Sequence, residues 1–474
     1  MKKTVLLIAA LLLGMATMVA KVTPAPIFAD DMVLQQKTDV ALWGTAKPDA
    51  KLVITTTWSK AKTVVYADAD GKWSAKLATP GAGGPYEITF NDGEKLTIRN
   101  VLIGEVWLCS GQSNMEMPLK GFEAQPVEGA ADVIISAKPS LPVRVCMLKK
   151  NVAYEVQDDC PATWLEHSPQ QIGNASATAY FFARKLQETL EVPVGVVVIA
   201  VGGTYIESWM EETLLRNEFK GEFDFTHLQT RKHVRAKAHR DPCVLYNGML
   251  SPVAGYTAKG FVWYQGCANV NNHDQYRRLQ PAFVKMLRSE WQNENMPFYY
   301  TQLTTHNSIT PEMKWIQALN IYDIPNSAIA MTLDVGDYAC IHAPKKKEVG
   351  ERLAYLALTR DYGLDVIDAK APMPINYIFN EGEAIVTFDV GDMGLSPCLV
   401  ELDGFELAGD DGVFYPAKCV VLRGKSWKGK SVKVYGCPEI AMPKAVRYAW
   451  KRDSQATLFN SSGIPVTPFS SQIR

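Results

Sequence analysis

The stretch VLIGEVWLCSGQSNMEMPL, residues 101–119, decides the fold of this chain. It begins with an apolar run of the length of a buried strand, and the run stops at a polar turn that carries Ser113. A serine at such a turn is presented to solvent while the strand behind it keeps the backbone fixed. This placement suits a nucleophile, although a polar loop after a strand is also an ordinary structural feature.

The region around this stretch alternates strand-like and helix-like segments. Strands are predicted at Val101–Cys109, Val194–Val201, Gly260–Tyr264, Phe298–Leu303 and Ala328–Leu333, and helices at Ala179–Leu190 and Tyr276–Trp291. Such alternation predicts an α/β fold with a doubly wound parallel sheet. Ligands bind beyond the carboxyl ends of the strands in these sheets, and each candidate motif described below follows a predicted strand.

Both ends of the chain are rich in short strands with alternating apolar and polar residues. In the N-terminal part, Asp70-Gly71 and Asp92-Gly93 indicate turns of antiparallel hairpins. We therefore expect a β domain at residues 21–100, an α/β domain at 101–365 and a β region at 366–474. The accessory antiparallel β regions thus flank the parallel sheet on both sides.

The first 20 residues have the pattern of a secretory signal peptide. Lys2 and Lys3 precede a short apolar run, and small residues follow. Cleavage after Ala16 satisfies the small-x-small pattern through Gly14, and cleavage after Ala20, which leaves Met18 at the less suitable position, is the alternative. No later run is long enough to span a bilayer. The mature protein is therefore predicted to be periplasmic or extracellular.

Composition and charge exclude some classes of partner and cofactor. Without the two leader lysines, 47 basic residues face 50 acidic ones, a formal charge of −3, so no nucleic-acid partner is implied. The nine cysteines include no CxxC pair, and the seven histidines are dispersed, so no metal site is predicted. An odd number of cysteines leaves at least one free thiol.

Three further motifs follow predicted strands or precede a helix. Gly202-Gly203 ends a valine-rich strand, which allows either a tight turn or close approach of a ligand to a backbone amide. Asn269 lies in the loop after FVWYQG and carries a neutral donor, although loop asparagines usually bond their own backbone. His342 stands just ahead of a helix, where a lone histidine is often structural.

The order serine, glycine, asparagine, histidine is that of the SGNH hydrolases, whose fold is flavodoxin-like. More closely, the chain resembles the sialate O-acetylesterase family of carbohydrate esterases. The likeness runs through most of the mature sequence, in the blocks IFADDMVLQQ, GEVWLCSGQSNMEMPL, GGTYIESWM, LYNGMLSPVAGYTAKGFVWYQG and HAPKKKEVGERLA.

The resemblance implies a role for each of these residues. Ser113 is expected to be the nucleophile and His342 the general base. The Ser113 amide, the Gly203 amide and the Asn269 side chain are expected to form the oxyanion hole. The implied reaction is removal of O-acetyl groups from sialic acid or a related glycan through an acetyl-serine, without a cofactor.

Two positions depart from the family pattern. Relatives usually have an aspartate two residues before the histidine and a glutamate in the WYQGExN block, where this chain has Cys340 and Cys267. Losing the acid that orients the histidine can lower the rate by roughly four orders of magnitude. If both acids point towards the histidine in relatives, the two cysteines lie close enough to allow a disulfide, the alternative being two reduced thiols.

The sequence leaves open both what orients His342 and which function the protein has. Ser113 and His342 can act as a dyad with a backbone carbonyl orienting the ring, or Asp337 or Asp334 can orient it from the same loop. A glycan-binding homologue with little or no activity and an acetyl xylan esterase are the alternative functions. A lipase is disfavoured because the GxSxG elbow is absent around Ser113. Trp107, Trp209, Trp263 and Tyr264 lie near the motifs, as sugar-stacking or core residues.

Overall fold

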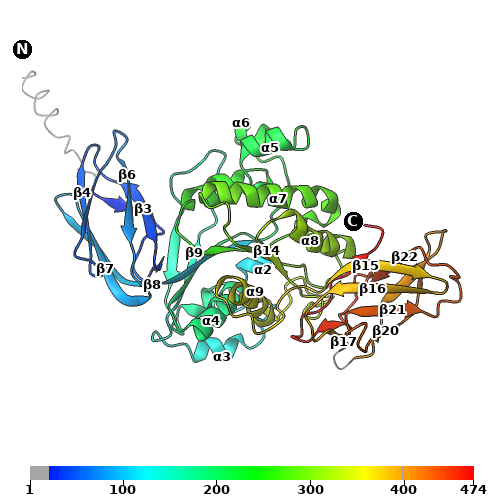
Figure 1. The fold of residues 1–474 in the computed structure, drawn as a ribbon. Coiled ribbons are helices and arrows are strands. Elements are labelled where there is room, and N and C mark those ends of the chain that lie inside the picture. Colours follow the sequence, from blue (N-terminus) through cyan, green and yellow to red (C-terminus); the bar gives the residue numbers. More distant parts are fainter. Residues whose placement is uncertain (1–20, 398–399, 474) are drawn as a thin grey trace, which may run out of the picture.

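The computed structural model describes residues 21–397 and 400–473, which form three regions in sequence order (Figure 1). An N-terminal β region, a central α/β region and a C-terminal β region follow one another along the molecule. The predicted signal peptide and Cys398 lie outside the described residues. Within the described part, no helix is both long and apolar enough to cross a bilayer.

The central sheet confirms the predicted doubly wound arrangement. Its strand order is β10-β9-β11-β8-β12-β13-β14, and all neighbouring pairs are parallel except β10 with β9. The strands are β8 (Lys95–Gly111), β9 (Val143–Leu148), β10 (Ala162–Leu165), β11 (Val194–Ala200), β12 (Gly260–Tyr264), β13 (Phe298–Thr301) and β14 (Ser327–Ala330). One antiparallel edge strand therefore completes a sheet of six parallel strands.

Helices cover both faces of this sheet. Figure 1 shows α4 (Ala177–Leu190) and α9 (Lys346–Asp361) on one face, and α7 (His273–Glu290) and α8 (Pro311–Asp323) on the other. Every residue of β11 is buried, as expected for a parallel strand covered on both sides. The apolar run of that strand is therefore the sequence signature of its position in the middle layer.

The chain changes direction across the sheet at β8. After β8 it builds β9 and β11 on one side, and later β12, β13 and β14 on the other. Ligand sites of open α/β sheets lie beyond the carboxyl ends of the strands at such a reversal. Ser113 follows β8 directly, so the topology places it at this point.

The N-terminal region confirms one of the two predicted hairpins. β7 (Gly83–Asn91) pairs with β8 around Asp92-Gly93. The hairpin at Asp70-Gly71 is wrong, because β5 (Lys62–Tyr66) pairs with β4 (Lys51–Thr56) while β6 (Lys72–Ala78) pairs with β3 (Asp39–Thr45). The Asp-Gly turn there joins strands of different sheets. The expected domain boundary at residue 100 falls inside β8, which belongs to both regions.

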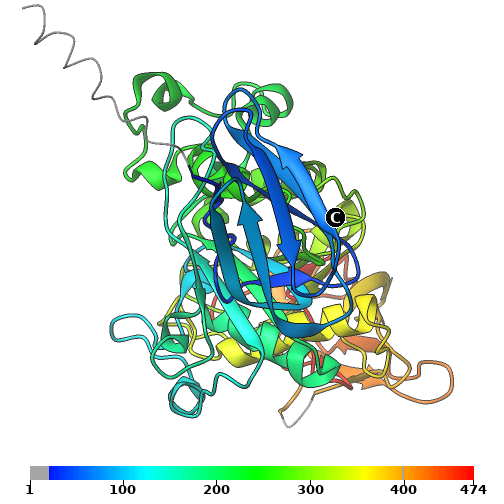
Figure 2. The same cartoon turned by 90° about the vertical axis from the view of Figure 1, so that its left-hand side faces the viewer.

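Two short strands complete this region, β1 (Thr23–Pro24) against β3 and β2 (Val33–Gln35) against β8. Figure 2 looks at the molecule from this end and shows the blue strands nearest the viewer, in front of the α/β region. The N-terminal region therefore covers one end of the central sheet.

The C-terminal region consists of antiparallel sheets, as predicted. One contains β15 (Met373–Asn380), β16 (Glu383–Asp389), β21 (Ser431–Tyr435) and β20 (Lys418–Leu422); another contains β19 (Phe414–Pro416), β18 (Phe405–Ala408), β22 (Ala445–Tyr448) and β24 (Phe469–Ser470); β17 (Leu395–Ser396) pairs with β23 (Phe459–Asn460). The Phe469 ring packs against Trp315 of α8, with ring centroids 6.2 Å apart. This contact joins the region to the central helices.

Candidate active site

Ser113 stands at the sharp turn where β8 ends. Gly111 has φ 143°, and a β-carbon there would lie 2.2 Å from the carbonyl oxygen of Tyr264, so this position requires glycine. Ser113 then begins the short helix α2 (Ser113–Glu116) and stays half-buried, whereas Asn114 and Met115 are buried behind it. The turn thus fixes the backbone and leaves the serine accessible.

Gln112 ties this turn to the loop after β12. Its side-chain oxygen accepts hydrogen bonds from the amides of Gly266 and Cys267, at 3.0 and 3.1 Å, and its side chain is buried. Two motifs that are far apart in the sequence are therefore held as one unit.

His342 reaches Ser113 from the loop between β14 and α9. Nε2 of His342 lies 2.8 Å from Oγ of Ser113. The ring also packs edge-on against Phe122, with centroids 5.1 Å apart. The structure thus brings together the two residues predicted to be nucleophile and base, at the distance required for proton transfer.

Gln125 supports the other side of the histidine ring. Its side-chain oxygen lies 2.5 Å from Nδ1 of His342. An amide oxygen only accepts, so Nδ1 carries the proton and Nε2 offers its lone pair to the Ser113 hydroxyl. The backbones of Gln125 and Phe122 bond each other at 3.0 and 3.1 Å, which fixes the loop. Gln125 occupies the place that a carboxylate holds in a serine triad.

Gln125 was not among the predicted site residues. It lies in a loop that follows no strand, and a glutamine has no acid-base chemistry that would mark it in a sequence. Neither predicted aspartate orients His342. Asp334 forms an ion pair with Arg352 at 2.6 Å, and Asp337 accepts hydrogen bonds from the amides of Ala339 and Cys340. The hypothesis that one of them supplies the acid is therefore wrong.

Cys267 and Cys340 are free thiols. The Cys340 thiol donates to the carbonyl oxygen of His342 over 3.4 Å. Burial raises the pKa of Cys267 to about 12, so this group stays protonated at neutral pH. The disulfide alternative is not what the structure contains.

Lys346 is a buried amine that joins the serine turn to the histidine loop. Nζ donates to the side-chain oxygen of Asn114 over 2.7 Å and to the carbonyl oxygen of Ala343 over 2.6 Å. Burial lowers its pKa to about 7. Since Asn114 follows the serine and Ala343 follows the histidine, Lys346 positions both. In the sequence it is one of three consecutive lysines, a pattern typical of a solvent-exposed face.

The electrostatic surroundings of His342 disfavour its charged form. Burial, followed by the positive charge of Lys346 and the nearby ring of His306, lowers the pKa of His342 to about 4. Gln125, the residue that bonds the other side of the ring, is neutral and does not counteract this shift. The ring is therefore unprotonated at neutral pH and is ready to accept a proton, although it is a weaker base than a histidine paired with an acid.

The glycine pair lies beside the serine. A β-carbon on Gly202 would approach Cβ of Ser113 to 3.2 Å, and the Gly202 amide donates to Glu116 over 2.6 Å. Burial raises the pKa of Glu116. Among the described residues, the amides of Ser113 and Gly203 have no hydrogen-bond acceptor. These two N–H groups are therefore free to bind a negatively charged oxygen.

Asn269 is completely buried and already bonded. Its side-chain oxygen accepts from the amide of Ile206 and from Gln265, at 3.1 and 2.9 Å, and its side-chain nitrogen donates to Glu207 over 3.1 Å. One N–H of the amide group remains for a further acceptor. Asn269 therefore braces the loop after β12 and has a single donor left.

The four aromatic residues near the motifs belong to the core. Trp107, Trp209, Trp263 and Tyr264 are completely buried, so they do not stack on a sugar. A cavity of about 430 Å³ is lined by residues that include Arg235, Asn271, His273 and Glu207, and Glu207 accepts the hydrogen bond from Asn269. Polar side chains of this kind suit a hydroxylated ligand.

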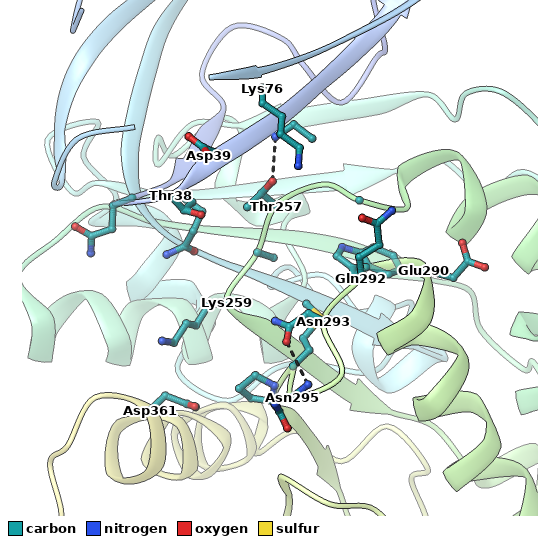
Figure 3. Close-up of a pocket in the computed structure, with 18 of the residues that line it drawn as sticks. Thr38, Asp39, Lys76, Thr257, Lys259, Glu290, Gln292, Asn293, Asn295 and Asp361 are labelled. Carbon is teal, nitrogen blue, oxygen red and sulfur yellow. Dashed lines mark hydrogen bonds between the residues drawn. The ribbon is translucent and has the colours of Figure 1, made fainter. Parts of the chain in front are cut away.

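A second polar cavity of about 730 Å³ lies at the amino ends of the central strands, on the side of the sheet away from Ser113 (Figure 3). Its lining includes Lys259 just before β12 and Asn326 just before β14, so it opens at the amino ends of the strands. Thr257 there accepts a hydrogen bond from the amide of Ala41 in the N-terminal region, over 3.1 Å. This cavity lies between the N-terminal β region and the central α/β region, away from Ser113.

Residues 103–359, more than half of the chain, match the family described as carbohydrate esterase, sialic acid-specific acetylesterase. The chain belongs to this family. Ser113, Gln125, Gly203, Asn269 and His342 all lie within the matched part. The resemblance inferred from the motifs is confirmed.

Relatives of this carbohydrate esterase match it over almost its full length. Mouse sialate O-acetylesterase is 26% identical over 519 residues, covering 93% of each chain. Human sialate O-acetylesterase is 26% identical over 501 residues, covering 93% of this chain and 90% of the human one. The crystal structure of a carbohydrate acetylesterase from Xanthomonas citri matches with a TM-score of 0.85 and 29% identity, covering 96% of this chain and 100% of that one. The fold class, including both β regions, is thus shared with a carbohydrate acetylesterase.

Proposed function

We propose that the protein is an exported serine esterase that removes O-acetyl groups from sialic acid or a related acetylated glycan. The observation that carries this proposal is the hydrogen-bonded chain from Ser113 through His342 to Gln125, with distances of 2.8 and 2.5 Å. In this proposal Ser113 is the nucleophile, His342 is the base in the productive tautomer, and Gln125 holds the base in place. A binding protein has no need of this arrangement.

In the first step, Ser113 Oγ attacks the acetyl carbonyl carbon while Nε2 of His342 takes the hydroxyl proton. Negative charge develops on the carbonyl oxygen, and the amides of Ser113 and Gly203 are the donors proposed to stabilise it, together with the remaining N–H of Asn269. One such donor is typically worth about 3 kcal/mol in the transition state. The tetrahedral intermediate then collapses, the C–O bond to the sugar breaks, and the imidazolium gives its proton to the departing sugar oxygen.

In the second step, His342 takes a proton from water, and the resulting hydroxide attacks the acetyl-serine. Collapse breaks the bond to Ser113 Oγ, which regains its proton from His342, and acetic acid leaves as acetate. The amide of Gln125 stabilises the transient imidazolium less than a carboxylate does, because it carries a dipole and no charge. An amide is nevertheless a known third member of such triads, as in Cys-His-Asn proteases.

Acetate release tests the proposal directly. We expect the wild type to release acetate from p-nitrophenyl acetate and from O-acetylated N-acetylneuraminic acid, and Ser113→Ala to lose this activity by at least about 1,000-fold. Equal rates for the two proteins would overturn the esterase proposal. Ser110→Ala is the matched control, because Ser110 is buried in β8 and bonds the carbonyl of Ile199.

Export rests on the leader sequence, in which Lys2 and Lys3 precede an apolar run. We expect the mature protein to begin after Ala16 or Ala20 when the full chain is expressed in a secreting host. N-terminal sequencing of the protein from the periplasm or medium tests this. Recovery of the uncut chain from the cytosol alone would contradict it.

A further inference from the structure

Arg240 lies against the glycine pair of the proposed oxyanion hole. Its Nε donates to the carbonyl oxygen of Gly203 over 2.9 Å. A β-carbon on Gly203 would lie 3.3 Å from Nη2 of Arg240, and one on Gly202 would lie 3.2 Å from Cβ of Ser113. Only the glycine pair therefore separates the guanidinium group from the nucleophile.

His239 and Lys150 extend this group of donors. Nζ of Lys150 lies 2.9 Å from Nδ1 of His239, and Nε2 of His239 would lie 3.9 Å from a β-carbon on Gly203. Burial, with the charges of Lys150, Arg240 and Lys237, lowers the pKa of His239 to about 4, so the ring is neutral. Because an ammonium only donates, Nδ1 accepts and Nε2–H is left as a donor on the side of Gly203.

Neither positive charge of this group forms an ion pair within the described residues. Within the described part of the chain, neither Arg240 nor Lys150 has a carboxylate within 4.0 Å, whereas Arg235 of the same loop pairs with Glu207 at 2.8 Å. The neighbouring carboxylates are engaged elsewhere. Asp241 accepts from the amides of Val234 and Arg235, and Glu116 accepts from the amide of Gly202.

We propose that Arg240, His239 and Lys150 form an anion-binding site that holds the carboxylate of an acetylated acidic sugar while its ester lies at Ser113. Arg240 is half-buried and has its Nη groups free to form two parallel hydrogen bonds to a carboxylate, the geometry that guanidinium groups favour. A neutral glycan such as acetylated xylan would leave these charges unpaired. This inference rests on the proposed function and specifies which acetylated sugars the site selects.

Two substrates that differ only in charge test the inference. O-acetylated N-acetylneuraminic acid carries the free carboxylate, and its methyl ester masks it. We expect the wild type to favour the free acid by about 10-fold or more in kcat/KM, and this preference to shrink as salt is added. Equal kcat/KM for acid and methyl ester at low salt would overturn the inference.

Variants then show which side chains produce the preference for the free acid over the methyl ester. Arg240→Met and Lys150→Met should each bring the ratio of acid to methyl ester towards one. Arg231→Met is the matched control, because Arg231 lies in the same loop, is exposed and pairs with Glu155 at 3.0 Å; it should keep the wild-type ratio. If Arg240→Met does not fold, Lys150→Met and the salt dependence still decide. An unchanged ratio in Lys150→Met and in a folded Arg240→Met would contradict the assignment.

Hydrolysis of p-nitrophenyl acetate by the wild type separates the two proposals. If this uncharged acetate is hydrolysed while acid and methyl ester react equally, only the anion site fails. If none of the three esters is hydrolysed, the esterase function itself fails.

Discussion

Oε1 of Gln125 and Nδ1 of His342 are 2.5 Å apart, and in the proposed catalytic site this contact takes the place of the carboxylate-to-imidazole bond of a serine triad. The amide sets the histidine tautomer that serine activation requires, without adding a negative charge. The resemblance indicated loss of the acid at Cys340 and Cys267. The structure adds that a neutral residue from a different loop supports the ring.

Removing the Gln125 side chain should weaken catalysis without preventing it. In Gln125→Ala, Nδ1–H of His342 loses its partner and the ring is free to adopt the unproductive tautomer. A lost hydrogen bond of this kind costs about 1–2 kcal/mol, so kcat for p-nitrophenyl acetate should fall about 10-fold. Glu123→Ala, an exposed residue of the same loop, should leave kcat unchanged. A lower kcat in the control would point to Glu123 as a hidden acid.

Gly202 should tolerate no side chain. The new β-carbon in Gly202→Ala would meet Oε2 of Glu116 at 3.0 Å and Cβ of Ser113 at 3.2 Å, which would displace Ser113, the proposed nucleophile. We expect kcat to fall about 10- to 100-fold while the melting temperature changes little. Gly81→Ala is the control, because its nearest neighbour is the flexible end of Lys37 at 3.6 Å. Full activity in Gly202→Ala would contradict the close contact between Gly202 and Ser113.

Lys346 should affect both stability and turnover. Burial lowers its pKa from 10.5 to about 7, so the folded protein binds this proton more weakly than the unfolded chain does. The free energy of unfolding therefore gains a contribution as the pH rises through 7 towards 10.5. Compared with Lys346→Met, the wild type should gain stability between about pH 6 and about pH 9 in urea titrations.

Lys314 provides the matched control for that experiment. It is equally buried, its pKa is also lowered to about 7, and its Nζ contacts Thr305 rather than the serine turn. Like Lys346→Met, Lys314→Met should remove a pH-dependent contribution to the free energy of unfolding, but it should keep the wild-type kcat. Lys346→Met should in addition lower kcat, because Asn114 and Ala343 lose their common donor. Equal kcat values for the two variants would contradict a positioning role for Lys346.

Cys267 and Cys340 should remain reduced under oxidising conditions. The Cys340 thiol bonds the His342 carbonyl, and the high pKa of Cys267 leaves almost no thiolate to attack a disulfide. Peptide mapping of the protein purified without reductant should find no cross-linked pair, and dithiothreitol should leave the activity unchanged. A 267–340 cross-link, or a change of rate with reductant, would contradict the free-thiol arrangement.

The sequence was sufficient for the parts of the fold that have a strong local pattern. The valine-rich β11 and the motif strand β12 are predicted within one residue, because a strand covered on both faces is apolar throughout. The motif strand β8 is predicted only over its buried second half, because it begins at Lys95 in the N-terminal region. Helix α8 was missed, since its buried residues occupy most of its length and leave no amphipathic period. The turn at Asp70-Gly71 shows that turn chemistry does not determine which strands pair.

The candidate site was predictable only where a residue type signals its chemistry. Ser113 and His342 were found because each follows or precedes a regular element in a family motif. Gln125 and Lys346 were missed, because their roles come from tertiary contacts across 217 and 232 residues of sequence. Asp334 and Asp337 are close to His342 in the sequence, but in the fold they contact Arg352 and backbone amides instead.

The most direct test of the neutral triad is the pH dependence of kcat/KM in the wild type and in Gln125→Glu. In the proposed mechanism the unprotonated ring is the base, so we expect activity to be lost as the pH falls through the pKa of His342, which is about 4 in the wild type. A carboxylate at position 125 would stabilise the imidazolium and raise that pKa by about 1–3 units. We predict a wild-type acid limb well below pH 6 and a limb shifted to higher pH in Gln125→Glu. Superimposable acid limbs, or a wild-type midpoint at the ordinary 6.5, would contradict the account.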